Sequence, residues 1–170
     1  ATPEQVDRVL YDFGLPMGPF AMSDLAGLDI GWKAETSTGS TVREIMCESG
    51  RRGQKNGRGY YTYDAETRAA TPDPEVEALI KAFAVGKGVE QREVSDQEIL
   101  ERLLYPMINE GAKILDEKIA SRGSDFDVVW VNGYGWPVYG GGPMHWADSV
   151  GLAEIAAKIN RYAESLGGKH

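Results

Sequence analysis

The sequence predicts an all-α fold, and three observations carry that prediction. Apolar residues recur at helical spacing along several stretches of the 170 residues. A short motif that begins with Gly-Pro and ends with Gly occurs twice, and each copy is typical of a short helix. The one strand-like run, residues 60–63, is too short to make a sheet of its own.

Five stretches have one apolar face, which we expect to be buried. The longest covers residues 96–120, where Ser95 is a suitable N-cap and Glu98 completes a capping box. Pro106 lies inside that stretch and predicts a kink or a bend. The inward residues are Val6, Val9 and Leu10 of 4–12; Val42, Ile45 and Met46 of 41–49; Val76, Leu79, Ile80 and Phe83 of 74–85; Ile99, Leu103, Leu104, Met107, Ile108, Ile114 and Leu115 of 96–120; and Leu152, Ile155, Ala156, Ile159, Ala163 and Leu166 of 152–166.

The chain contains an internal repeat. Residues 18–28 align without gaps with residues 142–152, and Gly, Pro, Asp, Gly and Leu match at the same offsets. The match continues loosely upstream from Asp7 and Asp127, each followed by a Gly-x-Pro turn. The sequence therefore predicts two copies of one helical unit.

Each copy of the repeat predicts the same local structure. A proline opens the short helix, and Gly27 or Gly151 ends it in a left-handed conformation. Asp24 and Asp148 occupy the same place in the two copies. We expect each carboxylate to make a structural hydrogen bond between its helix and a neighbouring loop; a catalytic carboxylate in both copies is the alternative.

The two copies differ in what precedes them. The long amphipathic stretch precedes Asp127, whereas only six residues precede Asp7. We therefore expect that the first unit lacks its long helix and that the chain begins inside a larger protein. The predicted division is 1–63 for a partial first unit, 64–95 for a linker with one helix, and 96–170 for the second unit.

The composition excludes several classes of protein. Lys and Arg number 18 against 26 Asp and Glu, a net charge of −8, which argues against nucleic-acid binding because that needs clustered cations. No apolar run approaches the roughly 20 residues of a membrane span, and no signal peptide opens the chain. Cys47 is the single cysteine, and His145 and His170 are the two histidines, which excludes an internal disulfide and a multi-histidine metal site. A single cysteine is compatible with a reducing cytosol, and we expect a cytoplasmic protein.

Two segments are candidates for chemistry. Loop 50–59 is basic and glycine-rich. With Arg43, its cations could contact an anionic cofactor or a neighbouring domain, or carboxylates could pin them, which is commoner. The loop matches neither a Walker loop nor a dinucleotide fingerprint. The aromatic residues of 130–146 could form the floor of a pocket, or they could fill a core, and the second arrangement is commoner. We expect His145 to be a buried or half-buried structural residue and Cys47 to be inert packing.

Several motifs resemble one enzyme family. Residues 13–20 and 23–29, with the run Gly-Gln-Lys-Asn-Gly-Arg-Gly-Tyr-Tyr at 53–61, resemble the C-terminal region of L-3-hydroxyacyl-CoA dehydrogenases. Residues 101–111 and 133–144 resemble a second unit of that region, typical of the multifunctional β-oxidation enzymes that fuse an enoyl-CoA hydratase to the dehydrogenase. The resemblance covers nearly the whole chain. It implies two tandem helical units of the 6-phosphogluconate dehydrogenase C-terminal-like fold.

The resemblance also implies which parts of the enzyme carry the catalytic residues. In the family an N-terminal Rossmann domain binds NAD and supplies the catalytic His with its Glu partner, and a catalytic Asn lies on the long helix of the first unit. Glu101-Arg102 stands where that unit would have Asn-Arg, so the second copy does not replace the asparagine. We therefore expect no catalytic and no cofactor-binding residue in this chain, and no turnover by the chain alone.

Three residues are implied as substrate contacts. Pro16, Met17 and Met22 match positions that line the acyl pocket of the family. Gly140 departs from the family, in which an arginine often precedes Gly-Gly-Pro, so the resemblance does not carry over any anion contact made at that position. The implied function is that of a C-terminal piece of an NAD-dependent enzyme that oxidises 3-hydroxyacyl-CoA to 3-ketoacyl-CoA. Its implied partners are the acyl-CoA, the missing Rossmann domain and a possible second copy in a homodimer. The alternative is a non-catalytic helical module for dimerisation or docking.

Overall fold

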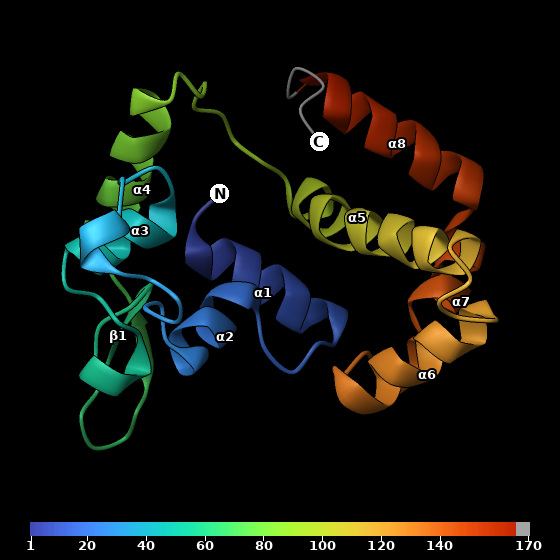
Figure 1. Ribbon diagram of the computed structural model, residues 1–170, viewed down its shortest axis with the longest axis horizontal. Coiled ribbons are helices and arrows are strands. Elements are labelled where there is room, and N and C mark those ends of the chain that lie inside the picture. The colour runs from blue at the N-terminus through green and yellow to red at the C-terminus, as the bar shows by residue number, and fades with distance from the viewer. Residues whose placement is uncertain (166–170) are drawn as a thin grey trace. The chain divides into compact units, whose positions relative to one another are not determined.

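The computed structural model describes residues 1–165, which are mostly helical (Figure 1). The predicted all-α fold is confirmed, because the described residues form eight α-helices, three short 3-10 turns and one two-stranded hairpin. The elements are α1 (Pro3–Phe13), α2 (Pro19–Ala26), α3 (Val42–Glu48), β1 (Tyr61–Tyr63), β2 (Ala70–Pro72), α4 (Pro74–Gly86), α5 (Asp96–Asp116), α6 (Gly123–Gly133), α7 (Pro143–Val150) and α8 (Leu152–Ser165).

The described chain divides into two compact units. Unit 1 comprises Ala1–Arg8 and Met17–Val94, and unit 2 comprises Val9–Pro16 and the chain from Ser95 onward. Helix α1 therefore contributes its first turns to unit 1 and its last turns to unit 2. Residues 64–94, which the sequence predicts to be a linker with one helix, belong to unit 1.

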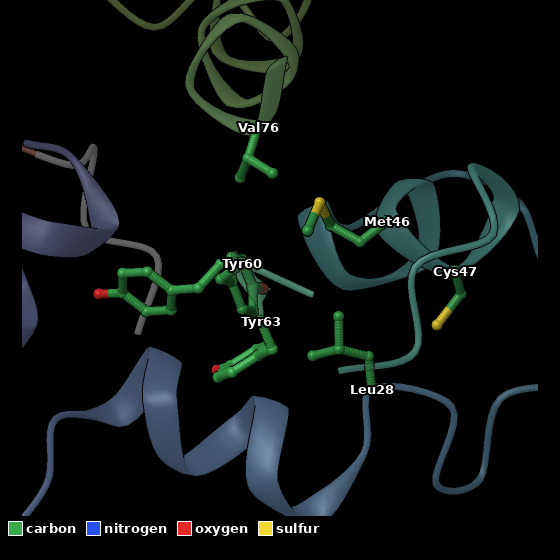
Figure 2. Packing of buried hydrophobic residues seen from close by; sticks show 7 residues of the cluster. Leu28, Met46, Cys47, Tyr60, Tyr63 and Val76 are labelled. Atoms are coloured by element: carbon green, nitrogen blue, oxygen red, sulfur yellow. The ribbon is translucent and has the colours of Figure 1, made fainter. Parts of the chain in front are cut away.

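The core of unit 1 gathers side chains from separate segments. Leu28 after α2, Met46 of α3 and Val76 of α4 are at most 1 % exposed, and they pack with the tyrosines of the hairpin (Figure 2). Helix α3 begins at a capping box in which Thr41 and Glu44 bond each other's backbone N–H groups. The predicted inward direction is confirmed for Val42, Met46, Val76, Leu79 and Ile80, which pack in this core, whereas Ile45 and Phe83 are half-buried outside it.

The hairpin of unit 1 differs from the sequence prediction. Strands β1 and β2 pair antiparallel, with Thr62 opposite Thr71. The sequence predicts that residues 64–73 are a linker, but they form the turn and the returning strand. The side chains of β2 are all exposed. The strand therefore lacks the alternation of apolar and polar residues by which a half-buried strand is recognised.

Helix α5 is the longest element of unit 2, and it continues through the exposed Pro106 without a break. Ser95 caps the helix, as predicted, by accepting a hydrogen bond from the N–H of Glu98 at 3.2 Å. The carboxylate of Glu98 pairs with Arg102, one turn further on, at 2.8 Å. The buried apolar residues of α5 are Ile99, Leu104, Tyr105 and Ile108.

The apolar face of α8 is only partly covered. Ile155 is buried and Ile159 packs beside it, as predicted. Leu152 and Ala156, which the periodicity also predicts to face the core, are exposed. Leu166 lies outside the described residues.

Candidate functional site

Each unit contains the same carboxylate-capped turn. Asp7 accepts hydrogen bonds from the N–H groups of Phe20 and Ala21 at 2.9 and 2.8 Å, at the start of α2. Asp127 accepts from the equivalent groups at the start of α7, with its shortest bond, 2.6 Å, from the N–H of Met144. These bonds satisfy N–H groups that the first turn of a helix leaves without a partner. The cap role of the two aspartates was not predicted, because they lie far from the helices they cap in the sequence.

Gly18 and Gly142 let the carboxylates of Asp7 and Asp127 approach the starts of the helices that they cap. A Cβ at Gly18 would lie 2.4 Å from the Cα of Asp7, and a Cβ at Gly142 would lie 2.2 Å from the Cβ of Asp127. The short helices end at Gly27 and Gly151 with φ of 107° and 101°. Their ψ angles of 122° and 114° lie outside the left-handed helical region, so the predicted left-handed cap is wrong in detail although glycine is still required.

Asp24 confirms the predicted structural role in the first copy. Its carboxylate is 1 % exposed and accepts hydrogen bonds from the N–H groups of Tyr60 and Tyr61 and from the hydroxyl of Tyr63, at 2.9, 3.1 and 2.9 Å. Burial raises the pKa of Asp24 against the opposing effect of these three donors. The carboxylate fixes the segment before and within β1 onto α2.

Asp148 does not play the same role. Its side chain is exposed, and no hydrogen bond or ion pair joins its carboxylate to any residue between 1 and 165. The predicted bond to a loop is therefore wrong for the second copy. The repeat dictates the helix and its turn, whereas the segment that meets the aspartate comes from a part of unit 1 that the repeat does not contain.

The cations of the basic loop are held by neighbouring acceptors. Arg51 is 1 % exposed and bonds the carboxylates of Asp73 and Glu75 at 2.7 and 2.6 Å. Glu75 also pairs with Arg58 at 2.8 Å, and Lys55 pairs with Asp29. Burial acts to raise the pKa of Asp73, but the hydrogen bond from Arg51 helps to hold that pKa below its ordinary value. These contacts favour the reading in which carboxylates pin the loop.

The aromatic segment 130–146 fills a core rather than flooring a pocket. Trp136 is 1 % exposed and meets Phe13 and Trp146 edge to face, with ring centroids 5.1 and 5.9 Å apart. A Cβ at Gly140 would lie 2.9 Å from Nε1 of Trp136. The glycine that departs from the family pattern therefore sits closely against this indole. Tyr139 is 84 % exposed and lies outside the core.

His145 is exposed, so the prediction of a buried or half-buried imidazole is wrong. The ring lies against the backbone of Gly141, where a Cβ would come 2.4 Å from Cδ2 of the imidazole. Together with apolar Val128 and Val138, His145 lines a shallow, open hollow of about 430 Å³ on unit 2. The carboxylate of Asp127 also borders this hollow, but its oxygens are occupied by the start of α7.

A buried carboxylate on α5 occupies the position where the resemblance would require asparagine for catalysis. Glu101 is 3 % exposed and accepts hydrogen bonds from Lys158 and Tyr162 of α8 and from Gln97 at 2.8 Å. Burial acts to raise the pKa of Glu101, but these donors outweigh it and hold the pKa below its ordinary value. Because Lys158 and Tyr162 lie on α8, these bonds to Glu101 tie α8 to α5.

The predicted lining residues lie in different environments. Met17 is half-buried, and Met22 of α2 is 53 % exposed; both belong to unit 1. Pro16 is exposed and belongs to unit 2, where a Cβ at Gly135 would meet its ring at 2.7 Å. Met22 is thus an apolar side chain that no core of the described residues covers.

The described residues bear on two further kinds of site, a metal-binding cluster and a reactive thiol. No group of three or more His, Cys, Asp or Glu side chains gathers there as a metal site would require. Cys47 is 1 % exposed, and burial raises the pKa of its thiol, so it packs as an inert thiol as predicted. None of the helices in this part of the chain has the length and the apolar character that crossing a bilayer requires.

Comparison with known proteins gives a consistent result. A family model described as "3-hydroxyacyl-CoA dehydrogenase, C-terminal domain" matches residues 1–63 and 99–170. The "Peroxisomal bifunctional enzyme" of Danio rerio is 40 % identical over 98 % of this chain and 26 % of its own length, and that of Homo sapiens is 42 % identical over 94 % and 25 %. A crystal structure of the dehydrogenase part of multifunctional enzyme 1 from C. elegans superposes with a TM-score of 0.74 at 30 % identity, over 96 % of this chain and 38 % of that one. The chain spans about a quarter of the length of these curated relatives.

Proposed function

Because the chain belongs to the family of 3-hydroxyacyl-CoA dehydrogenase C-terminal domains, we propose that it is the helical part of an enzyme that oxidises 3-hydroxyacyl-CoA to 3-ketoacyl-CoA with NAD. One observation carries the proposal. The same family model matches both stretches that contain the internal repeat, 1–63 and 99–170. The equal carboxylate caps of α2 and α7 support it, because they mark the two stretches as structural copies.

The residues of this chain do not fit NAD. The described residues contain a two-stranded antiparallel hairpin, whereas a dinucleotide site needs a parallel sheet with a glycine-rich turn before a helix. The cations that could meet a pyrophosphate are already bonded, foremost the buried Arg51. We therefore assign NAD binding, and the catalytic residues, to another domain of the parent enzyme, and this chain to the acyl end of the substrate.

Met22 is the strongest candidate for contact with the acyl chain. It is exposed on α2, so it can meet a ligand without any change in the core of unit 1. Met17 and Pro16 flank the turn that leads into that helix. A flexible thioether side chain adapts to apolar ligands of different shape, which suits an acyl chain.

A chimera tests the proposed function. The matching region of the zebrafish bifunctional enzyme is replaced by this chain, and formation of NADH from a 3-hydroxyacyl-CoA is followed. We expect the chimera to be active, and both the enzyme without this region and the purified 170-residue chain to be inactive. A folded chimera that forms no NADH would disprove the assignment, and NADH formation by the chain alone would disprove the predicted inactivity.

A matched pair of substitutions in the chimera tests the lining residues. Met22→Ala should raise KM for long acyl chains several-fold and leave the unfolding midpoint unchanged, since the side chain is exposed. Leu25→Ala is the control, because Leu25 is similarly exposed on the same helix. Equal effects of the two substitutions on KM would remove Met22 from the pocket.

A non-catalytic docking module is the second candidate function. The hollow beside His145 is rimmed by Val128 and Val138, which are 60 % and 77 % exposed, and clustered exposed apolar groups are typical of interaction surfaces. This reading predicts self-association, including the homodimer that the resemblance implies. Size-exclusion chromatography with light scattering should then give twice the monomer mass, and Val138→Asp should return the monomer. A monomer at high concentration would favour the enzymatic role alone.

The basic loop and the compartment give two further tests. If loop 50–59 held the CoA phosphates alone, calorimetric titration with CoA would release heat; we expect none, because its cations are bonded. The sequence predicts a cytoplasmic location, whereas the names of the animal relatives place those proteins in the peroxisome. Microscopy of the parent protein carrying a fluorescent tag distinguishes the two compartments.

A further inference from the structure

Unit 1 contains a socket that holds an extended segment. Its polar part is Asp24, whose carboxylate accepts two consecutive backbone N–H groups, those of Tyr60 and Tyr61. Its apolar part is Leu28, four residues later, which is 1 % exposed beneath the tyrosines of this segment. The socket therefore joins one carboxylate and one leucine at the end of a short helix.

The same elements are present and uncovered in unit 2. Asp148 and Leu152 are the repeat counterparts of Asp24 and Leu28. Asp148 is exposed and Leu152 is 55 % exposed, with Ala153 and Ala156 exposed beside it on α8.

The framework that carries the two sockets is the same. Both helices, α2 and α7, have eight residues and begin with proline. The N–H of Gly27 bonds the carbonyl of Ser23 at 2.9 Å, and the N–H of Gly151 bonds the carbonyl of Ala147 at the same distance. The two glycines also share a positive φ. The local backbone is therefore the same as far as the glycine, after which Leu28 lies in a turn and Leu152 begins α8.

We propose that Asp148 and Leu152 form a second socket, which binds an extended peptide segment in the way that Asp24 and Leu28 bind residues 59–63. The partner is a segment with glycine, two residues that donate free N–H groups, and a tyrosine two positions later. The interior of a helix does not fit, because its N–H groups are already bonded to its own carbonyls. The surface is separate from the shallow hollow beside His145, whose lining does not include Asp148 or Leu152.

The occupied socket explains why the partner needs this pattern. A Cβ at Gly59 would lie 2.0 Å from Oδ1 of Asp24, so the residue before the two donors must be glycine. The hydroxyl of Tyr63 then reaches the second carboxylate oxygen at 2.9 Å. Charge-assisted bonds of this kind are the stronger class of hydrogen bond, so they give a short segment both register and affinity.

The experiment titrates the isotope-labelled 170-residue chain with a synthetic peptide of residues 57–64, Gly-Arg-Gly-Tyr-Tyr-Thr-Tyr-Asp, and follows amide signals by NMR. We expect saturable shifts at Asp148, Gly151 and Leu152 at millimolar peptide. Asp148→Asn should weaken binding roughly tenfold or more, because the acceptor loses its charge. Asn160→Ala, an exposed change on α8, should leave binding unchanged. A peptide N-methylated at both donor positions should not bind.

Each contrary result overturns the proposal. One is the absence of saturable shifts at Asp148 and Leu152. Another is equal binding of the methylated peptide, and a third is unchanged binding to the Asp148→Asn variant. Shifts confined to Asp24 and Leu28 would mean that the peptide only exchanges with the segment already bound in unit 1, which also contradicts a second socket. None of these readouts depends on dehydrogenase activity, so the proposed function is tested separately.

Discussion

Helices α2 and α7 have the same sequence pattern, the same length and the same carboxylate cap, yet they have different neighbours. In unit 1, Phe20 of α2 packs edge to face on Tyr60, with ring centroids 4.6 Å apart. In unit 2 its counterpart, Met144, packs in the cluster around Ile108 of α5. The repeat therefore specifies a turn and a helix, whereas the segments around them decide which face is buried.

The largest difference between the two units is expected at the matched aspartates. Asp24→Ala leaves three donors in unit 1 without an acceptor, the N–H groups of Tyr60 and Tyr61 and the hydroxyl of Tyr63. At about 1–3 kcal/mol for each of the three orphaned donors, we expect a loss of roughly 3–9 kcal/mol in the free energy of unfolding. Asp148→Ala should cost less than about 0.5 kcal/mol, as at an ordinary surface site. Urea unfolding, followed by hydrogen exchange, measures the loss in the free energy of unfolding for both variants. Equal losses would mean that the two aspartates do not differ in their environments.

The matched leucines should give the next largest difference. Leu28→Ala removes a fully buried side chain from the core of unit 1, and such changes cost about 2–5 kcal/mol. Leu152→Ala should cost less than about 1 kcal/mol, since that side chain is 55 % exposed. The measurement is the shift of the urea midpoint at constant slope. A large loss at Leu152 would show that α8 is covered in solution and would contradict the open second socket as well.

Sequence patterns predicted much of this fold, because helical periodicity and caps are local. The stripe of α5, its cap at Ser95 and the proline-first helices follow from residues within a few positions of one another. Strand β2 was not predicted, because its side chains are all exposed and it forms only by pairing with β1. The inward direction of Leu152 was predicted wrongly for a related reason: periodicity identifies an apolar face but not whether another element covers it.

The same distinction between local and distant contacts decides which parts of the candidate sites could be predicted. The alignment predicted that Asp24 bonds a loop, but it could not identify the donors in residues 60–63, which are more than thirty positions away. The caps at Asp7 and Asp127 were missed because each aspartate meets its helix only after the chain has turned back on itself. Family resemblance, not periodicity, suggested Met22, and its exposure is compatible with a ligand contact.

The buried carboxylates of the two units should respond to pH in opposite directions. The pKa of Glu101 is held below its ordinary value of 4.5, so its ionised form stabilises unit 2 at neutral pH, and that contribution is lost as the pH falls through the lowered pKa. The pKa of Asp24 is raised, so the extra stability that comes from its protonated form is present in acid and is lost as the pH rises through the raised pKa. Glu101→Gln should cost about 2 kcal/mol at neutral pH, for the loss of a charged hydrogen bond to Lys158, and much less well below pH 4.5.

A control on the same helix isolates this effect. Glu110 pairs with Lys113 on the surface of α5, and both side chains are more than half exposed. Glu110→Gln should therefore change the free energy of unfolding by less than about 0.5 kcal/mol at either pH. Urea titrations at neutral and acid pH supply the comparison. A cost of Glu101→Gln that does not shrink in acid would mean that the ionised carboxylate is not what ties α8 to α5.

The smallest expected difference concerns the two caps, which are the most similar feature of the units. Asp127→Ala removes the acceptor of the first N–H groups of α7, which should cost about 1–2 kcal/mol. Asp7→Ala should cost about 1 kcal/mol more, because Asp7 also accepts a hydrogen bond from the hydroxyl of Tyr61 at 2.8 Å. A double-mutant cycle of Asp7→Ala with Tyr61→Phe should yield a coupling near that extra amount, while Asp127→Ala with Tyr61→Phe should be additive. Since Tyr61 also donates its N–H to Asp24, this coupling measures how far the hairpin, which the described part of the second unit lacks, strengthens a cap that the two units share.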